Sequence, residues 1–276
     1  MTLFHQIEAL FNGQFAEPST CDAFGARESG RASRFEIRRV QAQHLSEAQR
    51  EEMWRCYSQF ADGRRDQFLE TIATADEAFL FYSRDSGAMT GFEAIRVLTV
   101  EFRGHPYTVI YSHYADLKPP ARGLNLLQRV AVGKFLRMKL RHPFRPMFWM
   151  YTASTYTSYL LLPNNVVEYW PRPERATPPH LRAVVDRVMR ELGKEGWDRS
   201  AGVVRRHGAL RYREGIVNSD PARLKNPHIR FYAGLNPRQE EGDSLACLCP
   251  MSARNFVALV VGMVRRPWRK LRVRAH

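Results

Sequence analysis

The segment Phe79–Leu140 decides the fold of this chain, and it reads FLFYSRDSGAMTGFEAIRVLTVEFRGHPYTVIYSHYADLKPPARGLNLLQRVAVGKFLRMKL. Its β-branched and aromatic runs, separated by short polar turns, predict three meandering strands at Phe79–Tyr82, Thr90–Phe102 and Tyr107–Leu117. An Arg-Gly turn then opens a long helix. Three strands before the first long helix argue against a doubly wound nucleotide-binding fold, in which strands and helices alternate, and predict an α+β protein.

The flanking segments supply the other predicted elements. Upstream, residues 35–40 alternate as a half-buried strand does, Ser46 is placed to cap a helix, and a short helix follows near Arg65–Ile72. Downstream, the pattern predicts strands at Met147–Tyr151, Gly202–Tyr212, His228–Leu235 and Ser244–Cys249, and helices at Pro178–Leu192 and Ser252–Val264. The chain thus divides into an N-terminal helix and linker at 1–34, a core at 35–165, and a C-terminal α/β extension with a basic tail at 166–276.

Composition limits the class of protein. The 276 residues carry a formal net charge of +14, which attracts coenzyme phosphates, anionic lipids or an acidic carrier protein. Nucleic acid is the weaker partner, because no nucleic-acid-binding motif accompanies the charge. The longest uncharged apolar run, Phe256–Val264, is too short to span a membrane, and no signal peptide is recognisable, so a cytoplasmic location is expected. The basic tail after it suits either peripheral contact with the inner membrane surface or a solvated helix end.

No metal site is predicted from the cysteines and histidines. The cysteines show no zinc-type pairing and are expected to be reduced core thiols: Cys21, Cys56, Cys247 and Cys249. The nine histidines are scattered, without a metal-binding pair.

The order of these parts resembles the GNAT (Gcn5-related N-acetyltransferase) superfamily of acyl-CoA N-acyltransferases over about residues 35–165. In that family three antiparallel strands lead to a strand whose end splays from the next one, and a turn of the form Arg/Gln-x-x-Gly-x-Gly/Ala opens the following helix. Tyr107–Leu117 resembles the splayed strand, and P-P-A-R-G-L-N-L-L resembles the turn, with Arg122 at the Arg/Gln position. The resemblance implies that this chain is a divergent member of the superfamily, with a mixed, mostly antiparallel sheet flanked by helices.

The resemblance also implies how a thioester donor binds, whether acyl-CoA or an acylated carrier protein. The pyrophosphate lies at the helix N-terminus, where free N–H groups and the helix dipole favour anions. The implied donor-binding residues run from the strand into the helix: Leu117, Arg122, Gly123, Leu124, Asn125, Leu126 and Leu127. Asn125 and Leu127 stand where the motif has glycine, and side chains there would crowd a pyrophosphate lying close to the backbone.

Acyl transfer to an amine also needs an acid for the leaving thiolate and a base for the amine. Family members place a tyrosine acid in the helix after the next strand. The run YTASTYTSYLLL offers Tyr159 as the first choice and Tyr156 as the second. The alternative for each tyrosine is a core position with its hydroxyl hydrogen-bonded.

Several side chains could serve as the base. His113 and Asp116 lie in the splayed strand, and His113 is favoured because histidine ordinarily titrates near neutrality. The alternatives are Glu93 and Glu101, which share one face of the preceding strand.

These features predict an N-acyltransferase that moves an acyl group from acyl-CoA or an acyl carrier protein to a small-molecule amine or a lipid-linked acceptor. The alternative is a non-enzymatic GNAT-like module that binds an acyl chain, a carrier protein or a partner protein, having lost coenzyme A binding with the motif glycines. Turnover with an acyl thioester separates the two.

Overall fold

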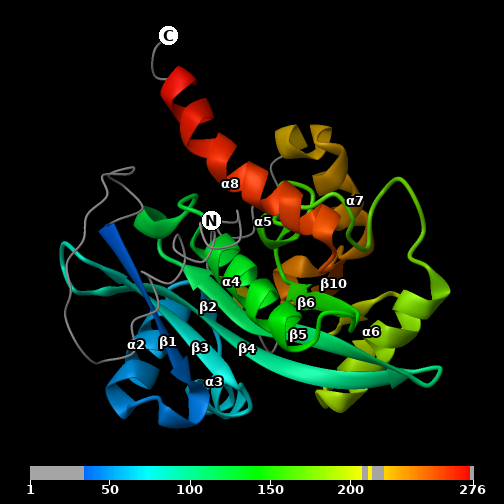
Figure 1. The fold of residues 1–276 in the computed structure, drawn as a ribbon, viewed down its shortest axis with the longest axis horizontal. Coiled ribbons are helices and arrows are strands. Elements are labelled where there is room, and N and C mark those ends of the chain that lie inside the picture. The colour runs from blue at the N-terminus through cyan, green and yellow to red at the C-terminus, as the bar shows by residue number, and fades with distance from the viewer. Residues whose placement is uncertain (1–33, 207–210, 213–220, 274–276) are drawn as a thin grey trace.

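A computed structural model describes residues 34–206, 211–212 and 221–273 of this chain. An eight-stranded sheet forms its centre (Figure 1), with strand order β1-β3-β4-β5-β6-β10-β8-β7. Neighbouring strands in this order are antiparallel except for β5 and β6, which are parallel. The predicted α+β class, with a mixed and mostly antiparallel sheet flanked by helices, is confirmed.

The elements have the following bounds. The strands of the central sheet are β1 (Phe35–Gln41), β3 (Glu77–Ser83), β4 (Met89–Phe102), β5 (His105–Leu117), β6 (Met147–Ala153), β7 (Trp197–Asp198), β8 (Val203–Val204) and β10 (Ser244–Pro250), while β2 (Ala61–Asp62) pairs with β9 (Arg211–Tyr212). The α-helices are α2 (Glu47–Tyr57), α3 (Arg65–Ala73), α4 (Leu126–Arg141), α5 (Tyr156–Tyr159), α6 (Pro179–Glu191), α7 (Pro227–Leu235) and α8 (Ala253–Val273). Short 3-10 turns occur at η2 (Ala42–His44), η3 (Pro119–Ala121), η4 (Pro221–Lys225) and η5 (Gln239–Glu241).

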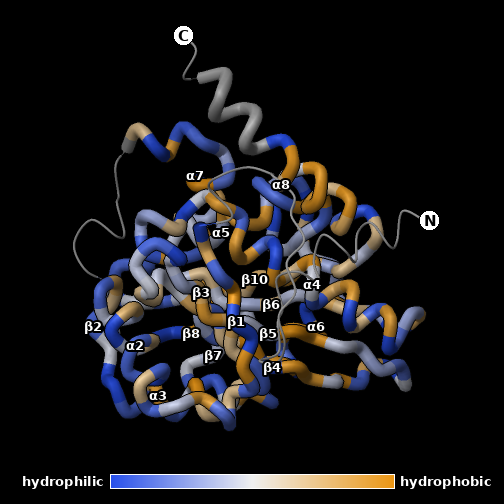
Figure 2. Tube along the Cα trace, turned by 60° about the vertical axis from the view of Figure 1, so that its left-hand side comes forward, coloured by the Kyte–Doolittle hydropathy of each residue, from blue (hydrophilic) through white to orange (hydrophobic). Residues whose placement is uncertain are grey.

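The period-2 pattern of the strands sends alternate side chains to two helical layers. Odd-numbered residues of β3, β6 and β10, such as Phe81 and Trp149, pack in the layer that contains α4, α5 and α7. Even-numbered residues of the same strands face the opposite layer, where α2 and α3 cover one end of the sheet and α6 the other. Apolar residues therefore follow the central strands, while the outer turns are hydrophilic (Figure 2).

Most predicted elements are found close to their expected bounds. Ser46 caps α2 through a capping box in which its hydroxyl accepts from the N–H of Gln49 and the Gln49 side chain accepts from the N–H of Ser46. The strand predicted at His228–Leu235 is wrong, because these residues form α7. The side chain of Asn226 caps this helix, Pro227 opens it, and Ile229 and Tyr232 face the core at helical spacing.

One further predicted strand is found only in part, and two segments with predicted structure lie outside the described residues. Within the strand predicted at Gly202–Tyr212, only the two-residue strands β8 and β9 form among the residues that the structure describes. The predicted N-terminal helix at 1–15 and its linker lie outside the described residues, as do the side chains of the basic tail from 266 onward.

Strand β10 joins the region after residue 165 to the central sheet. It pairs with β6 on one side and β8 on the other, and residues Ser244–Cys249 are buried. The region predicted as a C-terminal extension therefore contributes an interior strand to the core.

A buried ion pair holds α4 against the sheet. Lys134 of α4 lies 3.0 Å from Glu77 of β3, and Arg39 of β1 donates a hydrogen bond to the same carboxylate. Burial alone would raise the pKa of Glu77, but Arg39 and Lys134 lower it below its ordinary value. This contact fixes the helix whose N-terminus lies beside the candidate site.

Candidate active site

The parallel strands β5 and β6 separate halfway along their length. They are paired only from Thr108–Ser112 with Met147–Tyr151. On the other side of β5, Ile95 pairs with Ser112 and Ala94 with Tyr114, so His113 is an extra, bulged residue. A bulge bends its strand and increases the local twist. The end of β5 therefore splays from β6, as the resemblance implies.

A cavity of about 970 Å³ opens at this separation. It passes between the two helical layers, since residues of α2, α3, α4 and α8 all contribute to its wall. Of the residues considered for the site, those that line it are Glu93, His113, Asp116, Leu117, Arg122, Leu127 and Tyr156.

Glu93 lies in a buried hydrogen-bonded chain at the point of separation. The Ser112 hydroxyl donates to Glu93 Oε1 at 2.7 Å, and Trp149 Nε1 donates to the same hydroxyl at 3.0 Å. Glu93 Oε2 is buried without a hydrogen-bond partner among the described residues. Burial raises the pKa of Glu93 to about 7, although the Ser112 hydrogen bond opposes the shift. The carboxyl can therefore exchange a proton near neutral pH.

A second carboxyl, Asp116, lies further along the splayed end of β5. It lines the cavity on the side of α2, beside Tyr57 and Tyr114. Burial raises the pKa of Asp116 to about 7, and the positive charge of Arg122 only partly opposes this.

His113 reaches the cavity but does not have the expected basicity. Both ring nitrogens are buried, and neither has a hydrogen-bond partner in the described part of the chain. Burial lowers the pKa of His113 to about 3, and the charges of Lys194 and Arg96 act in the same direction. The prediction that His113 titrates near neutrality is wrong, because the reference value ignores burial beside two cations.

The three tyrosines of the predicted acid segment have different surroundings. Tyr159, the first choice, is fully buried, donates its hydroxyl to the Pro171 carbonyl at 3.0 Å and does not line the cavity. Tyr156 lines the cavity, with the Arg223 guanidinium 5.5 Å from its ring centre. Tyr151 also lines it, but its hydroxyl donates to the Ser158 carbonyl. The geometry therefore favours Tyr156 over Tyr159.

The turn between β5 and α4 leads into a helix N-terminus that no side chain caps in the described part of the chain. Gly123 and Asn125 both adopt left-handed backbone angles, with φ of 71° and 60°. Asparagine tolerates this region better than most residues, so Asn125 supplies the conformation that a motif glycine would provide. Its side chain does not cap α4 but donates to the Met263 carbonyl of α8 at 3.3 Å.

The remaining predicted donor-binding residues surround this turn. Arg122 donates from Nε to the Leu117 carbonyl at 2.8 Å and lies over the Phe60 ring. Leu124 is partly buried against the core, and Leu126 is fully buried. The first backbone bond within α4 runs from the Arg129 N–H to the Asn125 carbonyl, so within the described residues no backbone carbonyl accepts from the N–H groups of the first turn. Leu127 lines the cavity at the second glycine position.

Two cations of the cavity wall, Lys194 and Arg206, were not singled out from the sequence. They lie after α6 and β8, far from the splayed strand in sequence and outside any motif. Only the sheet topology brings them to the site.

No model of a known protein family matches the chain, and no curated protein matches it. Solved structures of N-acyltransferases do. A probable N-acyltransferase from Enterococcus faecalis is 14% identical over 48% of this chain and 33% of its own, with a TM-score of 0.35. A GCN5-related N-acetyltransferase from Kribbella flavida is 16% identical over 50% and 34%, with a TM-score of 0.34. An aminoglycoside N-acetyltransferase in complex with CoA is 15% identical over 59% and 90%, with a TM-score of 0.29.

The chain has a GNAT-like fold. This assignment rests on its own topology: antiparallel strands β1, β3 and β4, the splayed strand β5, and a turn that opens α4 before the parallel strand β6. The matched region spans about one third of the length of the first two similar structures. What those proteins bind or modify is a property of those proteins.

The described residues offer neither a metal-binding cluster nor a membrane-spanning helix. Among the described residues, no three His, Cys, Asp or Glu side chains gather where they could hold a metal ion. Within the same residues, none of the helices is both long and apolar enough to cross a bilayer. The three cysteines in this part, Cys56, Cys247 and Cys249, are buried and form no disulfide.

Proposed function

We propose that this protein is an N-acyltransferase that moves an acyl group from an acyl thioester to an amine. The observation that carries the proposal is the cavity at the separation of β5 and β6, with an ionisable Glu93 carboxyl on its wall and the N-terminus of α4 beside it. The reaction needs three parts in one place: an unpaired strand edge, a helix end that binds anions, and a proton acceptor.

The donor is an acyl-CoA or an acylated carrier protein. Its pantetheine arm lies along the edge of β5 beyond Ser112, where β6 no longer pairs with the strand. The pyrophosphate faces the first-turn N–H groups of α4, which follow the left-handed turn at Gly123 and Asn125 and have no side-chain cap in the described part of the chain. Because the Asn125 side chain bonds to α8, it does not occupy the cap position that a phosphate would take.

Glu93 is the base in this proposal. It accepts a proton from the attacking amine, whose nitrogen forms a bond to the thioester carbon. A backbone N–H on the unpaired edge of β5 stabilises the oxyanion. When the C–S bond breaks, the thiolate takes a proton from Tyr156. The products are an amide and a free thiol.

The test is release of free thiol from acyl-CoA substrates of increasing chain length, in the presence of simple amines. Thiol release that depends on both protein and amine is the expected result. A thermal shift with acyl-CoA but no release across amines and chain lengths would instead favour the alternative, a non-enzymatic module that binds an acyl chain or carrier. No shift with any acyl-CoA or acylated carrier protein would contradict the acyltransferase and leave, of the alternative, only a module that binds a partner protein.

The acid assignment has a matched pair of variants. Tyr156→Phe removes the hydroxyl of a tyrosine that lines the cavity, whereas Tyr159→Phe removes one that donates to the Pro171 carbonyl. Turnover should fall about tenfold or more in Tyr156→Phe and stay near wild type in Tyr159→Phe, with donor binding intact in both. The reverse order would restore Tyr159 as the acid.

A further inference from the structure

The wall of the cavity carries two partly buried cations near Tyr111. Lys194 and Arg206 both line it, and no described residue forms an ion pair with either of them. Arg206 Nε is buried without a hydrogen-bond partner in the described part of the chain. Buried cations without partners are costly, so such positions usually face an anion.

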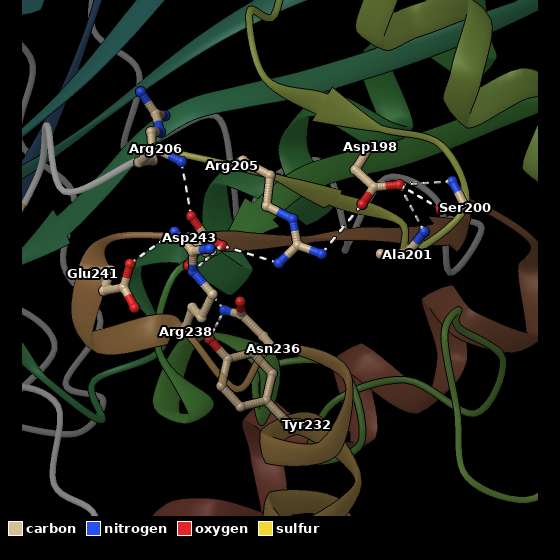
Figure 3. Close-up of polar contacts among 10 residues, drawn as sticks. All are labelled: Asp198, Ser200, Ala201, Arg205, Arg206, Tyr232, Asn236, Arg238, Glu241 and Asp243. Atoms are coloured by element: carbon tan, nitrogen blue, oxygen red, sulfur yellow. Dashed lines mark hydrogen bonds and ion pairs between the residues drawn. The ribbon is translucent and has the colours of Figure 1, made fainter.

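The fold directs the Arg206 side chain into this space. Buried Asp243 accepts a hydrogen bond from Arg205 Nη1 at 3.1 Å and from the Arg206 backbone N–H at 2.7 Å. Arg205 also pairs with Asp198, and Arg238 lies 3.6 Å from Asp243. Figure 3 shows the Arg206 guanidinium pointing away from Asp243, whose carboxylate is already engaged. Arg205 therefore anchors the loop through Asp243 and Asp198, whereas the Arg206 side chain lies on the cavity wall.

Lys194 shares the same space. Its Nζ lies 5.4 Å from the centre of the Tyr111 ring, which in turn contacts the His113 ring edge-on at 5.1 Å. Burial lowers the pKa of Lys194 to about 8, and the nearby Arg206 charge adds to this effect. Two like charges held together in a cavity are stabilised by an anion between them.

The same chamber has a negative pole. The charges of Asp116 and Arg206 act in opposite directions on the pKa values of Tyr57, Tyr114 and Tyr212, so these rings lie near both groups. Tyr57 and Tyr114 also pack edge-to-face, with ring centres 5.0 Å apart. The chamber thus brings the two cations, aromatic walls and the Asp116 carboxyl around one space.

We propose that this chamber binds an acceptor whose amine lies near a carboxylate, as in an amino acid, with the carboxylate on Arg206 and Lys194 and the amine oriented by Asp116. The planar guanidinium suits bidentate binding of a carboxylate. This inference rests on the proposed acyl transfer, since it names the acceptor of that reaction.

The first experiment measures acceptor binding without any donor. Saturation-transfer NMR compares mixtures of the standard amino acids with the corresponding amino acid amides, which lack the carboxylate charge. Selective binding of one or more amino acids is expected, with affinity lowered roughly 10- to 100-fold in Arg206→Gln. Arg182→Gln, which removes an exposed arginine on α6, is the charge-matched control and should bind as wild type. Thermal unfolding of both variants confirms that they fold.

The second experiment uses thiol release to separate this inference from the proposed function. Arg206→Gln should raise the KM for the amino acid and leave the KM for the acyl donor unchanged. A raised donor KM instead would show that the cations hold the donor phosphates, and this inference would fail. Thiol release with plain amines, but no preference for amino acids over their amides, would also overturn it while leaving the acyltransferase intact. Binding of amino acids without any thiol release would contradict the acyltransferase alone.

Discussion

At the scale of single residues, the surroundings of Glu93 raise its pKa to about 7. Its pKa of about 7 matches the pH at which an amine acceptor must be deprotonated. We predict that Glu93→Gln lowers kcat about 100-fold or more. It should also abolish the rise in rate that the wild type shows as pH increases through about 7. Rates of thiol release between pH 5.5 and 8.5 measure both effects.

Asp116 provides the control for this assignment, because its pKa lies in the same range. If Glu93 is the base, Asp116→Asn keeps the rise in kcat near pH 7 and acts mainly on the KM of the acceptor. Loss of that rise in Asp116→Asn, with its retention in Glu93→Gln, would transfer the role of base to Asp116.

Glu93→Gln should also stabilise the protein above neutral pH. The folded state raises the pKa of Glu93 from 4.5 to about 7, so it binds the proton more tightly than the unfolded chain does. The carboxyl therefore destabilises the folded state increasingly between these pH values, by up to about 3 kcal/mol. Glu93→Gln should raise the unfolding midpoint at pH 8 and change it little at pH 4. Glu101→Gln, at an exposed position of β4, should show no such difference.

At the scale of elements, the ion pair between α4 and the sheet decides whether the helix stays in place. Removing the charge of Glu77 leaves Lys134 and Arg39 without their shared anion. We predict that Glu77→Gln lowers the free energy of unfolding by about 3–5 kcal/mol. Lys134→Met should cost less, because Arg39 still pairs with the carboxylate. The double variant should be more stable than Glu77→Gln alone, and denaturant titration of the three proteins measures this order.

The pH dependence of this contact has the opposite sign to that of Glu93. Arg39 and Lys134 lower the pKa of Glu77 below its ordinary 4.5 despite burial. Its contribution to stability is therefore present above pH 4.5 and is lost as pH falls through the lowered value. Equal destabilisation by Glu77→Gln at pH 7 and at pH 2.5 would contradict this account.

Local patterns in the sequence predict the elements well but not their tertiary surroundings. The strands around Phe79–Leu117 are marked by hairpin turns, which are local signals. The run at His228–Leu235 is short and apolar, and such runs do not distinguish strand from buried helix. Glu93 could be selected from its strand position, whereas the lowered pKa of His113 comes first from burial and then from Lys194 and Arg96, and neither burial nor Lys194 is visible in the local sequence. Arg206 carries no signal among 42 lysines and arginines.

At the scale of the whole molecule, local sequence patterns likewise do not show how the regions before and after residue 165 pack together. Strand β10 follows that boundary, yet it pairs with β6 over six residues and supplies Leu245, Cys247 and Cys249 to the layer under α4. The candidate site also draws Lys194 and Arg206 from this region. The side chains proposed for catalysis and for acceptor binding thus come from both parts of the chain.

A chain that ends at Asn165 is therefore predicted not to fold. It would expose the edge of β6 and the apolar side chains that β10 covers, and an exposed apolar edge promotes aggregation. A chain that ends at Val273 keeps every described element and should unfold cooperatively at the wild-type temperature. Circular dichroism and thermal unfolding of the two chains measure this difference. A cooperative transition in the shorter chain would show that residues 35–165 form an independent domain, and that the region after them is dispensable for the fold.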